Sequence, residues 1–366
     1  MKNRNSNIEL LRIVSIIMIV VGHYCYHGVG IDVVSKMPLG INRFLLEILN
    51  IGNLGSVLFV IISGYFLIQS KKVKLKKICQ IVFQVFFYSF FIYLILVIAN
   101  LEHFSFKNVL LSTFPFTFKL YWFSSAYLIL YIFHPYINLL LNSFTRKQNF
   151  TFIFIMFLIF SFLSFLTTSD YYGNELIQFL LFYAIGAYLY KYPKNIFNLH
   201  NNNIKFLLLS IAMIVVSIIS IDLLSNYLPI VTKHSTYFLK RTSPLVIIID
   251  VCLFNIFNNF SFGNSKCINK IASLVFGVYL ISDNRFLRII IWNNLFKNLN
   301  YIKSPFLFIH ILGSILLIVI ICLIIELFRK YLFDKLIFEK FNSKFDILET
   351  SIKKHMNSGY HYFIKN

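Results

Sequence analysis

The chain alternates long apolar runs with short polar connections. The runs are about 17 to 25 residues long, the length of helix that crosses the hydrocarbon core of a bilayer. We therefore expect an all-α, polytopic integral membrane helical bundle with about ten transmembrane helices. The sixth, eighth and ninth runs are short or interrupted by polar residues, so they are the weakest of the set. The expected spans are approximately residues 8–26, 44–68, 78–99, 120–141, 150–167, 175–190, 204–224, 243–260, 271–291 and 305–328.

The first apolar run, from Asn7 to Gly28, carries polar groups that are costly in lipid. Glu9 and Arg12 lie near its start and His23 lies near its end. The separation between Arg12 and His23 makes almost three helical turns, which places both side chains on one face roughly 16 Å apart. Glu9 precedes Arg12 by about one turn and lies beside it. An acid, a base and an imidazole along one membrane helix predict a functional site.

Composition agrees with a membrane protein. Of the 366 residues, 58% are hydrophobic, 18% are aromatic and only 13% are charged, whereas a soluble chain is about 25% charged. The five cysteines are scattered without a CxxC pair or the spacing of a metal site, so we expect lone thiols and no metal.

The net charge of +20 would suggest nucleic acid as a partner of a soluble protein. Here the lysines and arginines lie in short loops, and we expect them to set the topology, with the lipid bilayer as partner and no nucleic acid. With the N-terminus inside, 22 of the 34 basic residues fall in inner segments. This bias follows the positive-inside rule and predicts that both termini are cytoplasmic, in a multi-pass protein of the cell membrane. We expect the first span to be retained, because no small-residue cleavage site follows it.

Two parts of the chain are distinguished by their pattern. Residues 1–328 hold the expected membrane spans, and residues 329–366 form a basic tail in which apolar residues recur at helical spacing. The tail is either an amphipathic helix on the anionic inner leaflet or a solvated basic segment. Neither alternative gives it chemistry.

Arg12 and His23 each have a structural alternative. Arg12 lies about one turn inside the membrane boundary, where it would either extend to lipid phosphates or bind the phosphates of an incoming cofactor. His23 lies about 22 Å along the first span, in the outer half of the membrane. It would either bond to a carbonyl at the interface or transfer protons, for which an ordinary imidazole pKa is suitable.

The second span ends in a small-residue pair followed by a basic run. Ser63 and Gly64 are either a helix-packing notch or a place where a ligand approaches the backbone. The basic run is first a topology signal, and it is also a phosphate-attracting patch on the same side as Arg12. It comprises Lys71, Lys72, Lys74, Lys76 and Lys77.

The remaining polar candidates are weaker. Asp250 lies near mid-membrane, where we expect it to pair with a basic or tyrosine side chain of a neighbouring helix. Ordinary hydration at span ends would explain Glu175, Asp222 and Asp283. Trp122 is either a membrane-interface residue or a platform for a sugar ring.

Several segments together resemble the acyltransferase 3 family of integral membrane acyltransferases. NIELLRIVSIIMIVVGHYCYHG has the family's arrangement of an arginine, ten residues and a histidine near the N-terminus, and LFVIISGYFLI before a basic run resembles the second-helix motif. YWFSSAYLILYIFHPYIN, LIQFLLFYAIGAYLY and ASLVFGVYLI resemble the fourth, sixth and ninth helices. Where many relatives end the ninth-helix motif with histidine, this chain has Ser282 and Asp283, which leaves a second catalytic histidine without a counterpart.

The resemblance implies acylation, usually acetylation, of a carbohydrate with an acyl-CoA made inside the cell. By position it implies His23 as the essential histidine and Arg12 as its partner. We expect Glu9, which lies beside Arg12, to belong to the same catalytic group. Ser63 and Gly64 would line the site, and Lys71 to Lys77 would help to hold CoA.

We therefore expect a membrane O-acetyltransferase of the bacterial plasma membrane. Its donor would be acetyl-CoA, and its acceptor a cell-surface or secreted polysaccharide (an exopolysaccharide) or a polyprenyl-linked precursor. The alternative is a transporter or polymerase of lipid-linked glycans without acyl transfer. The sequence leaves open the sugar, the acyl group and the choice between direct transfer and an acyl-enzyme.

Overall fold

The structure is a computed structural model that describes residues 5–167, 174–193, 200–260 and 263–333. These residues form helices and connecting turns, with no strand among them, which confirms the all-α expectation. The α-helices are α1 Ser6–His23, α2 Ile31–Val34, α3 Ile41–Ile48, α4 Gly52–Leu67, α5 Leu75–Ile98, α6 Phe106–Thr113, α7 Trp122–Ser143, α8 Arg146–Phe157, α9 Ser164–Thr167, α10 Glu175–Lys191, α11 His200–Ser225, α12 Pro244–Asn259, α13 Lys266–Ala272, α14 Val275–Ser282 and α15 Leu307–Arg329. The π-helical segments are η1 Tyr24–Val29, η2 Leu158–Leu163 and η6 Ile290–Leu295, and the 3₁₀ turns are η4 Pro229–Val231, η5 Tyr237–Leu239 and η7 Asn298–Asn300.

Seven helical segments of the described chain are long and apolar enough to cross a membrane, so the protein is a multi-pass membrane protein. The other three expected spans, the sixth, eighth and ninth, coincide with shorter helices. α10 has 17 residues, α12 has 16, and the ninth is divided between α13 and α14. The total of about ten spans and the cytoplasmic termini stay predictions. Most of the basic tail, residues 334–366, lies outside the described residues.

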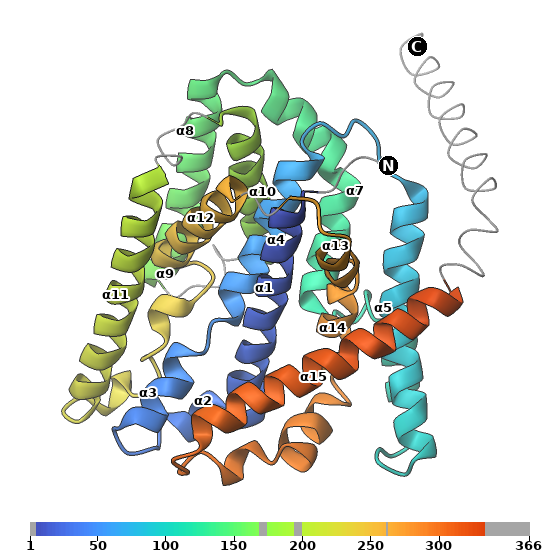
Figure 1. The fold of residues 1–366 in the computed structure, drawn as a ribbon, viewed down its shortest axis with the longest axis vertical. Coiled ribbons are helices and arrows are strands. Elements are labelled where there is room, and N and C mark those ends of the chain that lie inside the picture. Colours follow the sequence, from blue (N-terminus) through green and yellow to red (C-terminus); the bar gives the residue numbers. More distant parts are fainter. Residues whose placement is uncertain (1–4, 168–173, 194–199, 261–262, 334–366) are drawn as a thin grey trace.

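The centre of the bundle is α4, which packs against α1 on one side and α10 on the other. Figure 1 shows α1 and α4 side by side in the middle of the molecule, with α15 running obliquely across them. Glycines let these helices approach closely: a Cβ on Gly22 of α1 would lie 2.6 Å from the Cα of Gly52 in α4. Small residues at membrane helix interfaces allow such backbone contact, which replaces the hydrophobic driving force available in water.

The same contacts fix the direction of the helices. Gly52, at the start of α4, meets Gly22 near the end of α1, and Gly55 meets Ser15 one turn or more earlier in α1. The two helices are therefore antiparallel. One end of the bundle, here named the Arg12 end, holds the start of α1 and the loop after α4, and the opposite end is named the His23 end.

A buried ion cluster stabilises the His23 end. Arg43 of α3 is 3% exposed, and its Nη2 lies 2.6 Å from Oδ1 of Asp222 in α11. Its Nε donates to Oε1 of Glu47 at 3.1 Å, and Ser235 donates to the same oxygen at 2.7 Å. The expectation that ordinary hydration explains Asp222 is thus wrong, because the carboxylate is buried against a guanidinium. The cluster attaches the segment between α11 and α12 to α3.

We expect Asp222→Ala to lower the free energy of unfolding by about 3 kcal/mol, because the buried Arg43 guanidinium loses its shortest ion pair and keeps only Glu47 as a counter-charge. Thermal unfolding of the detergent-solubilised protein measures this. The control is Asp32→Ala, which breaks the exposed ion pair of Asp32 with Lys233 at the same end. That variant should unfold like the wild type, since exposed pairs add little stability. Equal unfolding temperatures for both variants would show that the cluster does not stabilise this end.

The structure bears on two further expectations, one for Asp250 and one for the cysteines. Asp250 of α12 is fully buried, and neither of its carboxyl oxygens has a hydrogen-bond partner among the described residues. The expected pairing with a neighbouring basic or tyrosine side chain is therefore wrong, because no such group of the described residues bonds to either oxygen. All five cysteines lie within the described residues and are free thiols, as expected.

Candidate active site

A cavity of about 700 Å³ occupies the His23 end of the bundle. α1, η1, α4 and the start of α7 form its walls, together with the segment before α12 and the residues that follow α14. His23 lines this cavity, as do the aromatic side chains of Trp122, Phe123 and Tyr279. The cavity therefore combines an imidazole with a polar and aromatic lining, a composition suited to a polar substrate.

The helix containing His23 changes geometry immediately after it. η1 is a π-helix from Tyr24 to Val29, and its wider turn keeps His27 on nearly the same face as His23. The two imidazole ring centroids are 5.4 Å apart. A short π segment thus brings a second histidine into the cavity, a use of such segments that is frequent at functional sites.

One ring nitrogen of His23 is occupied by a hydrogen bond. Nδ1 lies 3.1 Å from Oγ of Ser282, at the end of α14, and that hydroxyl donates to the carbonyl of Tyr279. A hydroxyl can donate or accept, so the tautomer of His23 sets which group donates in the contact between Nδ1 and Ser282. Nδ1 is thus engaged by Ser282, and Nε2 lies on the side of Asp283, which also lines the cavity.

A carboxylate lies close to Nε2 of His23. Oδ1 of Asp283 lies 3.9 Å from Nε2 of His23, and it accepts from Nε2 of His27 at 3.1 Å. Nη1 of Arg288 lies 3.6 Å from the same oxygen. Asp283 is only 6% exposed, so the expectation of ordinary hydration is wrong for this residue as well. The carboxylate would stabilise an imidazolium formed on either histidine by protonation.

His23, His27 and Asp283 also have the geometry of a partial metal site, with ligand atoms within 4.8 Å of one another. However, Nη1 of Arg288 lies 3.5 Å from Nε2 of His27 as well as close to Asp283. A guanidinium is permanently charged, and a positive charge so close opposes a divalent cation. The arrangement therefore suits proton transfer better than metal binding.

Trp122 and Phe123 form an aromatic wall of the cavity, and the cation of Arg241 lies beside Trp122. Trp122 packs edge-on against Phe123, and Cζ of Arg241 lies 4.6 Å from the Trp122 ring centroid. Burial lowers the pKa of the Arg241 guanidinium to about 10, against the opposing effect of Glu175, so the group is charged at neutral pH. The position of Trp122 in the cavity favours the sugar-platform alternative over the membrane-interface alternative.

Arg12 and Glu9 lie away from this cavity. Nη1 of Arg12 is 3.3 Å from both carboxyl oxygens of Glu9, and Cζ lies 5.6 Å from the ring centroid of Phe66, near the end of α4. Glu9 is buried, whereas the Arg12 side chain is 29% exposed. The ion pair predicted from their spacing is present, but the lining of the cavity includes His23 and neither of these two residues.

A sequence profile described as an acyltransferase domain, that of the acyltransferase 3 family, matches residues 5–327. The chain belongs to the acyltransferase 3 family. The match confirms the resemblance noted in the sequence and covers nearly the whole described bundle, including α1, the cavity and most of α15. No curated protein and no solved structure matches the chain.

The structure of this acyltransferase assigns contacts to the other predicted site residues. Ser63 donates to the carbonyl of Phe59 at 2.8 Å and lies 3.2 Å from the hydroxyl of Tyr127. Gly64 lies directly against the carbonyl of Tyr183 in α10, so its surroundings are those of the helix-packing alternative. The five lysines after α4 lie at the Arg12 end, and four of them are exposed; those four are Lys71, Lys72, Lys74 and Lys77, and the half-buried one is Lys76.

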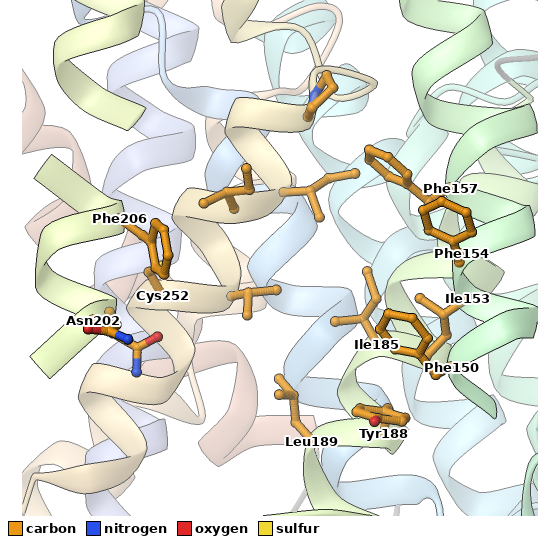
Figure 2. A pocket seen from close by; sticks show the side chains of 15 residues that line it. Phe150, Ile153, Phe154, Phe157, Ile185, Tyr188, Leu189, Asn202, Phe206 and Cys252 are labelled. Atoms are coloured by element: carbon orange, nitrogen blue, oxygen red, sulfur yellow. The ribbon is translucent and has the colours of Figure 1, made fainter. Parts of the chain in front are cut away.

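The acyltransferase has a second cavity, of about 350 Å³, between α8, α10, α11 and α12. Figure 2 shows that phenylalanine and aliphatic side chains such as Phe154, Phe206 and Ile185 surround it. Among the described residues, its lining contains no histidine, carboxylate, lysine or arginine, and its titratable side chains are those of Tyr188 and Cys252. Of the two cavities, the one at the His23 end brings histidines and a carboxylate together, so it is the candidate active site.

The residues that sequence reasoning missed are His27, Arg288 and Arg241. His27 had a local signal, since it follows His23 by one helical turn on the same helix. No local sequence signal indicated Arg288 or Arg241, because each reaches the cavity from a segment that is remote from α1 in sequence.

Proposed function

We propose that this family member is an O-acetyltransferase of the bacterial plasma membrane. It would move an acetyl group from acetyl-CoA to a hydroxyl of a cell-surface or secreted polysaccharide, or of its polyprenyl-linked precursor. The observation that carries the proposal is His23, which lines a large cavity with Nε2 near Asp283 while Ser282 holds its other nitrogen.

The chemistry at His23 would be general acid–base catalysis. Nε2 removes the proton from the acceptor hydroxyl, and the hydroxyl oxygen attacks the carbonyl carbon of the thioester. The tetrahedral intermediate then collapses with cleavage of the C–S bond, and the imidazolium returns the proton to the leaving CoA sulfur. Asp283, 3.9 Å from Nε2, stabilises the imidazolium in between.

His23 is also a candidate nucleophile, which gives a route through an acetyl-histidine. The two routes differ in what the enzyme does without an acceptor. Direct transfer predicts that purified enzyme given radiolabelled acetyl-CoA alone stays unlabelled after rapid denaturation. The nucleophilic route predicts one labelled histidine in the α1 peptide.

The Arg12 end would bind the phosphates of the donor. Arg12 is partly exposed there, and the lysines of the following loop are at the same end of the bundle. A guanidinium and several ammonium groups attract and bind phosphate oxygens. The donor would then extend from this end toward His23, and the acceptor would enter the cavity from the opposite end.

We expect Arg12→Ala to raise the KM for acetyl-CoA about tenfold or more, the loss for one charged hydrogen-bonded contact. Steady-state assays in reconstituted vesicles measure it at saturating acceptor. The control is Lys147→Ala, which removes an exposed cation at the same end and should leave the KM unchanged. An unchanged KM in Arg12→Ala would remove this residue from the donor site.

The proposal as a whole is tested by supplying purified, reconstituted protein with radiolabelled acetyl-CoA and the polysaccharide of the host cell. Labelled polysaccharide whose acetyl groups are released by mild base supports O-acetylation. Failure to label any fraction of that polysaccharide with acetyl-CoA, by correctly inserted protein, contradicts it.

A further inference from the structure

The cavity at the His23 end carries an excess of positive charge that acid–base catalysis does not require. Its lining contains more cations than carboxylates, although a sugar hydroxyl is neutral. The cations are Lys119, Lys233, Lys240, Arg241 and Arg288, and the carboxylates are Glu175 and Asp283. Such a field attracts anionic ligands into the cavity.

Most of these cations already have partners within the protein. Three of them form ion pairs, Lys119 with Glu175 at 3.2 Å, Lys233 with Asp32 at 2.6 Å and Arg288 with Asp283 at 3.6 Å. Of the other two, Lys240 lies over the ring of Tyr237, and Arg241 forms no ion pair with a carboxylate of the described residues. The nearest acid that influences it, Glu175, is held by Lys119.

Arg241 is held in place by neutral groups instead. Its Nε donates to Oε1 of the buried Gln178 at 2.5 Å, and its guanidinium lies over the Trp122 ring. These contacts fix the plane of the group without neutralising it, and among the described residues they leave the two terminal nitrogens to a ligand. A fixed, planar fork of N–H donors matches a carboxylate or phosphate group.

A continuous aromatic wall connects Arg241 with His23. Beyond Trp122, the ring of Phe123 lies 5.7 Å from that of Tyr279, and Tyr279 lies 6.4 Å from the His23 ring. Aromatic rings with polar groups at both ends suit the apolar faces of sugar rings. A glycan lying along this wall would place one group at Arg241 and another at Nε2 of His23.

We propose that the acceptor is an acidic glycan, and that Arg241 binds its carboxylate or phosphate group while a hydroxyl of the same glycan reaches His23. This inference rests on the proposed acyl transfer and adds the chemical class of the acceptor. Arg241 contributes to acceptor binding and takes no part in the proton transfer.

The test compares acceptors that differ only in their anionic group. Fragments of the host's surface polysaccharide are separated by anion exchange into acidic and neutral fractions, and part of the acidic fraction has its carboxyl groups reduced to alcohols. A further sample has its phosphate groups removed enzymatically. The KM of the wild type, of Arg241→Gln and of Arg241→Lys is measured for each fraction at saturating acetyl-CoA.

We expect the wild type to prefer the acidic fraction, and Arg241→Gln to raise the KM for that fraction about ten- to hundredfold. Arg241→Lys should restore part of the loss, because it keeps the charge without the fork. Lys303→Gln, which removes an exposed cation outside the cavity, is the control and should match the wild type. Loss of preference after carboxyl reduction identifies a carboxylate, and loss after dephosphorylation identifies a phosphate.

Other outcomes overturn the inference. Equal KM values for acidic and neutral fractions in the wild type, or an equal rise for both in Arg241→Gln, would show that Arg241 does not recognise an acidic group. A raised KM for acetyl-CoA alone would assign Arg241 to the donor. If acyl transfer is still observed, any of these results contradicts only the role of Arg241 and leaves the proposed function supported. If no fraction is acylated, the proposed function itself is contradicted.

Discussion

His23→Ala should abolish acyl transfer while leaving the protein inserted and folded. General acid–base catalysis contributes about 10² to 10⁴-fold to a rate, so we expect kcat to fall at least a hundredfold. Incorporation of labelled acetyl groups into polysaccharide, normalised to the amount of inserted protein, measures the loss. A normal rate in this variant would exclude His23 from the chemistry.

Two comparisons separate catalysis from structural damage. His103→Ala removes an exposed histidine of the loop between α5 and α6, and should leave the rate unchanged. Truncation of His23 enlarges the neighbouring cavity, so added imidazole has access to the vacated position. We expect imidazole to restore part of the rate of His23→Ala, and a control base of similar pKa but greater bulk to restore less.

Gly186→Ala should destabilise the protein more than any single change at the surface. A Cβ at Gly186 would overlap the carbonyl oxygen of Ile61, and one at Gly64 would overlap that of Tyr183. Both atoms belong to helix backbone, so relief requires α4 and α10 to separate. We expect a loss of about 3 kcal/mol in the free energy of unfolding for each substitution, the upper range for overpacking.

Thermal unfolding in detergent tests this expectation, with Gly313→Ala as the matched control. A Cβ on Gly313 of α15 meets nothing within 4 Å, so that variant should be as stable as the wild type or slightly more stable. The same series also tests the donor role that the family resemblance implies for Gly64. A raised KM for acetyl-CoA with an unchanged unfolding temperature would favour that role over packing.

The sequence predicted the membrane helices because lipid imposes a local requirement. A spanning helix must satisfy its backbone hydrogen bonds internally and present about 20 apolar residues, and both properties can be recognised within one segment. The long spans at α1, α5 and α15 are therefore present as expected. The three least certain spans correspond to α10, α12 and the α13–α14 pair. Each of these helices is too short to meet the length requirement on its own.

Candidate residues were predictable only where one helix carried the whole pattern. The pairing of Glu9 with Arg12 follows from spacing, and the structure contains it. The expectations for the surroundings of Asp222, Asp250 and Asp283 were wrong, because these surroundings are formed by other helices. Whether a carboxylate near a span is hydrated, paired or buried alone depends on which helices lie against it, and that information is not local.

The sequence by itself determined the fold class, the family and His23 as the leading histidine, because hydrophobic periodicity and short motifs are properties of contiguous residues. Only the tertiary structure decided what surrounds that histidine. Ser282, Asp283 and Arg288 come from a segment about 260 residues away, and Arg241 from yet another. Helix packing brings them together, and it places Ser282 at Nδ1 of His23 and Asp283 near Nε2.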